Sequence, residues 1–232
     1  MAELNESLDI LIGGYIVSLS PELGRGSYGT VFKARNKEDK KICVAKKIDL
    51  TAARSTELLE KANIEVRILQ KLSHPNIVQY LDVHIHKTSY WIFLEYCCEG
   101  DLKNYLLQHD FLSETQKCEI YFQCAKAVKY IHANNVVHRD IKLGNYLVTK
   151  ERDEYIIKLS DFGLSKLCED HVKDGNVMKT HAGTRYYRAP ELISREEYSD
   201  AIDIFSLGLV FLVVFKYGPG HSLTVPLTGN LV

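Results

Sequence analysis

The sequence lacks an excess of basic charge. Its 232 residues include 29 lysines and arginines against 30 aspartates and glutamates, which gives a formal net charge of -1. A chain without a broad basic field is not expected to hold nucleic acid or an anionic membrane surface by charge. Any anion that it binds must therefore be held by a local group of residues.

Patterned cysteines and long apolar runs are also missing. The six cysteines form no C-x-x-C pair, which favours reduced thiols in a cytoplasmic or nuclear protein over a secreted, disulfide-bonded one. The N-terminus is acidic where a signal peptide would be basic, so the apolar stretch at residues 11–17 is not expected to be a secretory signal. The longest apolar run, from Leu207 to Phe215, is too short to insert across a bilayer and is expected to be a buried helix.

What the chain does contain is enough apolar material for a globular fold. Hydrophobic residues make up 46% and charged residues 25% of the chain, which suits one large domain or two small units. From about Tyr15 to Tyr96 the pattern is rich in β-branched and aromatic residues. Strands are predicted at Val31–Phe32, Ile42–Leu50, Ile77–Val83 and Trp91–Leu94.

Helical patterns appear once in this first part and dominate after Gly100. Residues 57–72 carry apolar side chains at helical spacing, and Pro75 is expected to stop this helix. Further along, Ser113 followed by Gln116 at the third position matches a capping box and predicts the start of a longer helix. The sequence therefore predicts a small β-rich part with one helix, followed by a larger helical part.

The first chemical motif is a glycine-rich stretch from Gly24 to Gly29 with the pattern G-x-G-x-x-G. Glycines let backbone N–H groups approach phosphate oxygens, although the same residues are common in plain turns. The dinucleotide-binding fingerprint runs into a helix, whereas the residues after Gly29 alternate as a strand. The stretch is therefore expected to be a hairpin, which either covers a triphosphate or is a plain turn, and an oxidoreductase is disfavoured.

Further motifs follow this loop in a fixed order. They are Cys43-Val44-Ala45-Lys46-Lys47, Glu65, His138-Arg139-Asp140-Ile141-Lys142-Leu143-Gly144-Asn145, Asp161-Phe162-Gly163 and Ala189-Pro190-Glu191. In this order they resemble the catalytic domain of eukaryotic serine/threonine protein kinases.

The resemblance implies an α+β, bilobal protein-kinase-like fold. It predicts a kinase domain over residues 15–215, with a small antiparallel β lobe containing one helix at 15–96 and a larger, mainly helical lobe at 97–215. Residues 216–232 resemble no part of the family. The family has further C-terminal helices, so the domain is expected to be truncated and the apolar helix from Ile204 to Phe215 to expose a patch.

The resemblance also implies a reaction, transfer of the γ-phosphoryl group of ATP to serine or threonine hydroxyls of protein substrates. The alternative is a pseudokinase-like regulator that binds nucleotide without catalysis, because the large lobe is incomplete. Pseudokinases commonly lose the strand lysine or one of two aspartates, whereas Lys46, Asp140 and Asp161 are all present.

One lysine of the Val44-Ala45-Lys46-Lys47 motif should hold the phosphates of ATP and pair with a helix glutamate. The family commonly has alanine two residues before this lysine, which would indicate Lys47. Strand alternation places Lys46 on the apolar face and Lys47 with solvent-facing Asp49, so Lys46 is preferred. Its expected partner is Glu65, which otherwise would be a surface carboxylate.

Asp140 resembles the carboxylate that accepts or orients the proton of the substrate hydroxyl. Asn145 and Asp161 resemble the oxygen donors that hold Mg²⁺ beside the phosphates. Lys142, two residues after Asp140, is typical of serine/threonine kinases, and so is Thr184. The resemblance predicts that Asp140, Lys142 and Thr184 converge.

Adenine is expected at the segment that joins the lobes, through the carbonyl of Glu95 and the backbone of Cys97. Asp101 matches a position that meets the ribose, although at a helix start it would equally be an N-cap. The expected nucleotide-binding residues are Leu23, Gly24, Arg25, Gly26, Ser27, Gly29, Val31, Lys46, Glu95, Cys97, Asp101 and Leu147.

Two further expectations come from the resemblance. Thr180 is the predicted phosphosite for an upstream kinase, with Arg139 as the residue that pairs with its phosphate. An internal stack that supports active kinases is expected at Leu69, Tyr80, His138 and Phe162, anchored by Asp203.

Overall fold

The computed structural model describes residues 8–26, 29–51, 55–109, 111–167, 183–194 and 198–217. Two compact units make up the chain: residues 1–71 with 79–96, and residues 72–78 with 97–232. Within the described ranges, no helix is long and apolar enough to span a membrane.

The first unit is built on a six-stranded antiparallel sheet with the strand order β1-β2-β3-β4-β6-β5. Its strands are β1 (Asp9–Ile12), β2 (Tyr15–Gly26), β3 (Gly29–Asn36), β4 (Ile42–Asp49), β5 (Tyr80–His86) and β6 (Ser89–Glu95). β3 and β6 contain the strands predicted there from β-propensity, and β4 covers the predicted strand Ile42–Leu50 except for Leu50. β1 lies before the region in which strands were expected.

One predicted strand is wrong in its first residues. The run from Ile77 to Val83 was expected to be continuous, but β5 begins only at Tyr80. Ile77 instead forms a parallel bridge with Leu159 of the second unit, and the Val78 N–H donates to the Leu159 carbonyl at 3.0 Å. The apolar run is thus divided between two partners, a division that β-propensity does not encode.

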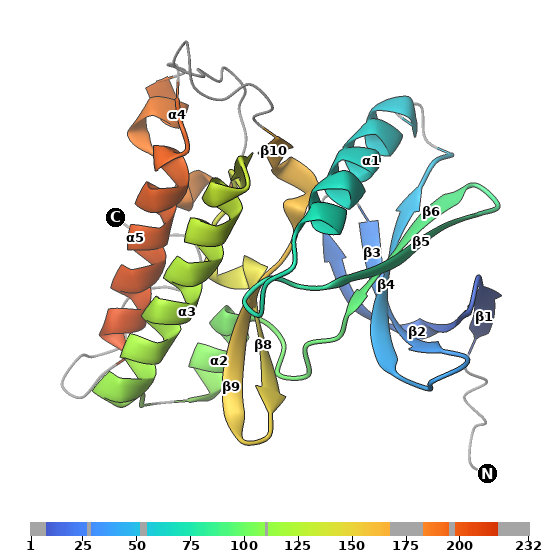
Figure 1. The fold of residues 1–232 in the computed structure, drawn as a ribbon, viewed down its shortest axis with the longest axis horizontal. Helices are drawn as coiled ribbons and strands as arrows, with labels where there is room; N and C mark the ends of the chain where they lie inside the picture. The colour runs from blue at the N-terminus through green and yellow to red at the C-terminus, as the bar shows by residue number, and fades with distance from the viewer. Residues whose placement is uncertain are drawn as a thin grey trace. The chain divides into compact units, whose positions relative to one another are not determined.

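The helix of the first unit, α1 (Ser55–Lys71), packs on the sheet (Figure 1). Its buried residues Ala62 and Val66 join Ile48, Tyr90 and Ile92 of β4 and β6 in one core cluster. Figure 1 shows α1 in cyan beside the strands it covers. This packing fixes the helix face that also carries Glu65, which is 2% exposed.

The second unit is mainly helical. Its helices are α2 (Leu102–Gln108), α3 (Glu114–Ala133), α4 (Pro190–Ser194) and α5 (Ala201–Lys216), with 3-10 turns η1 (Leu143–Asn145), η2 (Phe162–Leu164) and η3 (Arg185–Tyr187). Two small antiparallel sheets pair β7 (Val136–Val137) with β10 (Lys166–Leu167), and β8 (Tyr146–Glu151) with β9 (Glu154–Leu159). The segments between the helices of this unit therefore contain short paired strands.

The predicted capping box at the start of α3 is confirmed. The Ser113 hydroxyl accepts from the Gln116 N–H at 3.2 Å, and the Gln116 side chain accepts from the Ser113 N–H at 2.9 Å. Two N–H groups that have no partner within the helix are satisfied in this way.

α5 runs beside α3 (Figure 1), but it is not wholly buried. Leu207, Val210 and Val214 are buried as expected, whereas Leu212 and Phe215 are about half exposed. The expectation of a fully buried helix is therefore wrong for this face. Leu212 and Phe215 fit the other expectation for this helix, that it exposes apolar side chains.

A turn before β5 belongs to the second unit and carries a titratable group. The Nδ1 atom of His74 accepts from the Asn76 N–H at 3.0 Å, and its ring stacks on Tyr130 at 4.6 Å. Burial lowers the pKa of His74 below its usual value of 6.5, with smaller contributions in the same direction from Lys126 and Lys158. Protonation would also replace the Nδ1 acceptor with a donor.

We expect the free energy of unfolding to fall as the pH drops below 6.5, because the unfolded chain then binds the His74 proton first. This contribution is fully present above 6.5 and is lost toward the lower pKa of the folded state. Urea titrations between pH 5 and pH 8 test it by comparison with His74→Phe, which keeps a stacking ring. An identical pH slope in the two proteins would contradict the assignment.

Candidate active site

A carboxylate in the second unit accepts four hydrogen bonds. Asp140 follows β7, and its Oδ1 atom accepts from the Thr184 N–H at 2.7 Å and from the Thr184 hydroxyl at 2.8 Å. Its Oδ2 atom accepts from the Lys142 ammonium at 2.6 Å and from the Asn145 amide at 3.1 Å. The predicted convergence of Asp140, Lys142 and Thr184 is confirmed.

Lys142 and Asn145 are themselves held in place. The Lys142 ammonium also donates to the Thr184 hydroxyl at 2.9 Å, so it bridges two members of the cluster. The Asn145 Nδ2 atom donates to the Asp140 carbonyl at 2.8 Å as well as to the carboxylate. These donations orient the amide of Asn145, so that its Oδ1 atom is the one that could bind a cation.

Asp203 in the first turn of α5 fixes the loop that carries Asp140. Its carboxylate is 1% exposed and accepts from the N–H groups of His138 and Arg139, both at 2.8 Å, and from His132 Nε2 at 2.9 Å. Arg139 adopts a left-handed conformation with φ 67°, which is costly for a residue with a side chain. The two backbone bonds to Asp203 hold the loop in this shape.

A glycine allows Thr184 to approach this loop. Gly183 has φ +87°, and a Cβ at this position would collide with the carbonyl oxygen of Arg139. Only glycine tolerates both conditions without strain. Gly183 therefore brings the backbone N–H of Thr184 to the carboxylate of Asp140.

Ser160 connects the loop to the end of β9. Its N–H and its hydroxyl both donate to the Asn145 carbonyl, at 2.8 and 2.9 Å, and its carbonyl lies 3.0 Å from Nε2 of His138. Asp161 follows in a left-handed conformation with φ 61°, and its side chain is exposed. Phe162 is buried and packs edge-on against the His138 ring at 5.0 Å.

The second unit therefore contains part of the predicted internal stack. His138 contacts Phe162, and Asp203 binds the His138 backbone as expected. In the first unit, Leu69 is buried on α1 and Tyr80 is half-buried at the start of β5.

The first unit holds a buried ion pair. The Lys46 ammonium on β4 donates to both carboxylate oxygens of Glu65 on α1, at 2.7 and 2.9 Å. The side chains are 11% and 2% exposed. The neighbouring Lys47 instead lies 5.7 Å from the Trp91 ring centroid. The expected pairing of Lys46 with Glu65 is present, whereas contact of Lys46 with phosphate stays a prediction.

The glycine-rich stretch forms the expected hairpin of β2 and β3. Gly24 is paired with Val31, Arg25 with Thr30, and Gly26 with Gly29. A Cβ at Gly29 would collide with the carbonyl oxygen of Lys47 on the next strand, so the close pairing of β3 and β4 requires glycine here. Leu23, which precedes the glycine-rich stretch on β2, is exposed.

The remaining predicted nucleotide-binding residues lie in both units. Glu95 ends β6, and Cys97 begins the longer segment of the second unit and is buried. Asp101 caps α2 by accepting from the Asn104 N–H at 2.8 Å, and it forms an isolated bridge with Leu147 of β8. Asp101 thus performs the structural role that was the alternative for it. Its contact with ribose stays a prediction, and Ser27 and Thr180 lie outside the described residues.

Sequence reasoning missed three polar residues near this loop. Ser160 links Asn145 to β9, while Asn76 and Gln123 bond to the outer edge of the same strand. Gln123 could have been noticed as a polar residue beside the apolar stripe of Ile120 and Cys124. Nothing local marks Asn76 or Ser160.

The chain resembles known proteins over most of its length. Residues 17–221 match the protein kinase domain family. CBL-interacting protein kinase 11 of Oryza sativa subsp. japonica is 35% identical over 215 residues, covering 92% of this chain and 42% of that protein. Human serine/threonine-protein kinase 10 is 34% identical over 212 residues, covering 89% and 21%. Serine/threonine-protein kinase pakG of Dictyostelium discoideum is 37% identical over 198 residues, covering 85% and 16%.

The chain spans less than half the length of these relatives. The family match covers well over half of the chain and includes the buried Lys46–Glu65 pair and the cluster around Asp140. The chain belongs to the protein kinase domain family.

Proposed function

We propose that this chain catalyses transfer of the γ-phosphoryl group of ATP to serine or threonine hydroxyls of proteins. The observation that carries the proposal is the bonding of Asp140 to Lys142, Thr184 and Asn145 within one cluster. The relatives described above are named as protein kinases, and two of them as serine/threonine-protein kinases.

The reaction requires a group beside the acceptor hydroxyl. The hydroxyl oxygen forms a bond to the γ-phosphorus while the bond to the β–γ bridging oxygen breaks, and ADP leaves with that electron pair. The proton of the hydroxyl passes to the carboxylate of Asp140. Lys142, bonded to the same carboxylate, supplies positive charge beside the transferred group.

The acceptor hydroxyl must find room at a carboxylate that already has four donors, which is about its full capacity. The Asn145 amide makes the longest of these bonds, 3.1 Å, and keeps its 2.8 Å bond to the Asp140 carbonyl if the longer one is lost. We therefore place the incoming hydroxyl at Oδ2 of Asp140 in exchange for this bond.

The donor types of Asn145 and Asp161 suit Mg²⁺. One amide oxygen and one exposed carboxylate are hard oxygen ligands, which Mg²⁺ prefers in combination with phosphate oxygens and water. Bound Mg²⁺ would neutralise charge on the phosphates. The N–H and hydroxyl of Ser160, the residue before Asp161, donate to the Asn145 carbonyl, and these bonds keep Asn145 and Asp161 next to each other.

Lys46 is proposed to hold the α- and β-phosphates of ATP while Glu65 fixes its side chain. We expect Lys46→Met to weaken ATP binding about 10–100-fold, since a hydrogen bond to a charged group contributes about 1.5–3 kcal/mol. Lys47→Met removes a neighbouring lysine of the same strand and is the matched control. Fluorescent ATP titrations measure both, and a larger loss for Lys47→Met would assign the phosphate contact to Lys47.

The overall proposal is tested by incubating the purified chain with Mg-ATP and a generic protein substrate, followed by phosphoamino acid analysis. We expect phosphoserine and phosphothreonine. ATP binding without transfer would contradict the proposal and favour a nucleotide-binding regulator. Phosphotyrosine alone would contradict the assignment of the acceptor.

Regulation and location are parts of the same proposal. Thr180 is proposed as the site at which an upstream kinase adds a phosphate, with Arg139 as the partner of that phosphate. The protein substrates are proposed to meet the chain in the cytoplasm or nucleus, where reduced thiols are the rule.

A further inference from the structure

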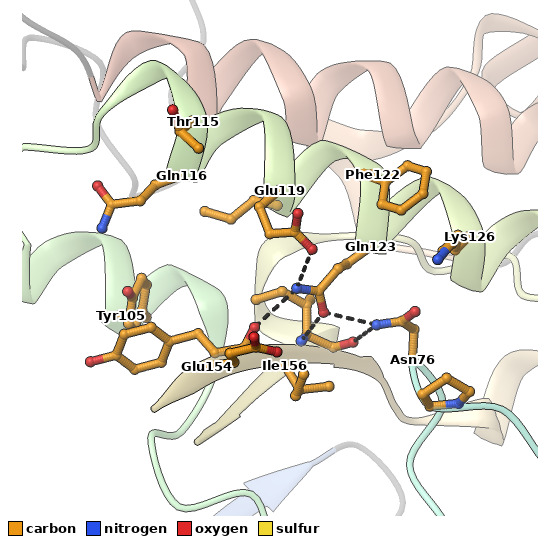
Figure 2. Close-up of a pocket in the computed structure, with 14 residues that line it drawn as sticks. Asn76, Tyr105, Thr115, Gln116, Glu119, Phe122, Gln123, Lys126, Glu154 and Ile156 are labelled. Carbon is orange, nitrogen blue, oxygen red and sulfur yellow. Dashed lines mark hydrogen bonds between the residues drawn. The ribbon is translucent and has the colours of Figure 1, made fainter. Parts of the chain in front are cut away.

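A cleft in the second unit has a buried amide at its base. The cleft has a volume of about 540 Å³ and lies between α3, Tyr105 of α2 and β9 (Figure 2). Figure 2 shows Gln123 of α3 reaching from the helix toward β9 and Asn76. Gln123 and Asn76 are 6% and 5% exposed.

These two amides cover the outer edge of β9. The Gln123 Oε1 atom accepts from the Ile157 N–H at 2.7 Å, and its Nε2 atom donates to the Tyr155 carbonyl at 2.9 Å. The Asn76 Nδ2 atom donates to the Ile157 carbonyl at 2.8 Å and to Gln123 Oε1 at 2.9 Å. Only one orientation of the Gln123 amide satisfies both backbone groups, because one is a donor and the other an acceptor.

Backbone bonds continue this edge to the end of the strand. The Leu159 N–H donates to the Asn76 carbonyl at 2.9 Å, and the Val78 N–H donates to the Leu159 carbonyl. β8 pairs with the opposite edge of β9. β9 is therefore held on one side by a strand and on the other by two side chains and a short segment.

The strand leads directly into the candidate active site. Ser160, next after Leu159, binds the carbonyl of Asn145 through its N–H and its hydroxyl. Asp161 follows in its left-handed conformation. A shift of β9 along or away from its neighbours would move both Asp161 and the bonds to Asn145.

We infer that Gln123, together with Asn76, positions the Mg²⁺ ligands Asp161 and Asn145 by fixing the outer edge of β9. This inference rests on the proposed function, because it assigns those ligands. Gln123 is not among the residues assigned to nucleotide or substrate. It acts through β9, and its loss would let water from the cleft compete for the edge of the strand.

The test is Gln123→Met, which keeps the length of the side chain and removes both its donor and its acceptor. We expect faster amide hydrogen exchange over residues 155–161 and a rise of about tenfold in the Mg²⁺ concentration that gives half-maximal activity, as for other residues that support metal ligands. The midpoint of urea unfolding separates this effect from general destabilisation. Faster exchange with an unchanged Mg²⁺ requirement, or unchanged exchange, would overturn the inference.

Two further variants sharpen the test. Asn76→Ala removes the donor to the Ile157 carbonyl and leaves both Gln123 bonds to β9, so we expect an effect between those of the parent and Gln123→Met, and a parental exchange rate would contradict the inference. If Gln123→Met fails to fold, Asn76→Ala carries the same measurements. Glu119→Ala removes only the 3.1 Å bond from Gln123 to Glu119 and leaves β9 untouched, so it should match the parent.

Failure of the proposed function can be distinguished from failure of the inference about Gln123. A parent chain that transfers no phosphoryl group would contradict the proposed function. The exchange comparison over residues 155–161 would still decide whether Gln123 holds β9.

Discussion

Asp140→Asn is expected to lower kcat for phosphoryl transfer by about 10²–10⁴-fold while ATP binding persists. The substitution removes the carboxylate that accepts the proton of the acceptor hydroxyl. It also replaces one carboxylate oxygen with an NH₂ group. In one orientation of the new amide this group faces the donors of Lys142 and Asn145, and in the other it faces those of Thr184. Donor then faces donor, so the alignment of the site suffers together with proton transfer.

Initial rates at saturating Mg-ATP measure this effect, and nucleotide titration shows whether binding is retained. Asp153→Asn is the matched control, because the Asp153 side chain is 99% exposed and lies in the turn between β8 and β9. The control should keep parental activity. Equal rates for Asp140→Asn and the parent would contradict the mechanism, whatever the control shows.

Asp203→Ala is expected to lower the free energy of unfolding by roughly 3–5 kcal/mol. The change deletes the acceptor for two backbone N–H groups, those of His138 and Arg139, at a position where the carboxylate is 1% exposed. A buried donor left without a partner costs about 1–3 kcal/mol. The left-handed conformation of Arg139 adds strain that these two bonds now offset.

Urea denaturation measures the change, and a loss of phosphoryl transfer should accompany it because His138 and Arg139 immediately precede Asp140. Asp200→Ala provides the comparison. The Asp200 side chain is 58% exposed and lies 3.7 Å from His132, so its removal should change stability by about 0.5 kcal/mol or less. An Asp203→Ala protein that unfolds at the same urea concentration as Asp200→Ala would contradict the role given to Asp203.

Much of the site could be predicted because its determinants are local or follow a fixed order. Strand alternation indicated which of two adjacent lysines faces Glu65, and the structure has that pair. The serine and glutamine that start α3 form the cap that their spacing predicts. The order of motifs predicted that Lys142 and Thr184 would meet at Asp140, although they are 42 residues apart.

Long-range pairing explains what was missed. Ile77 and Val78 have the composition of a strand, but their partner is Leu159, and nothing in their own neighbourhood identifies it. Gln123 bonds to Asn76 and Ile157, which are 47 and 34 residues away. A periodic pattern predicts which helix face is buried, whereas it does not show which backbone atoms that face meets.

The segment 72–78 has a further consequence, since it belongs to the second unit although the first unit both precedes and follows it. The second unit is therefore discontinuous in the sequence. A fragment that starts at Cys97 would lack Asn76 and Val78, and with them the bonds that close the end of β9. Isolating this unit by a single cut would remove part of its own structure, whereas a circular permutation that joins residues 72–78 to its end would retain it.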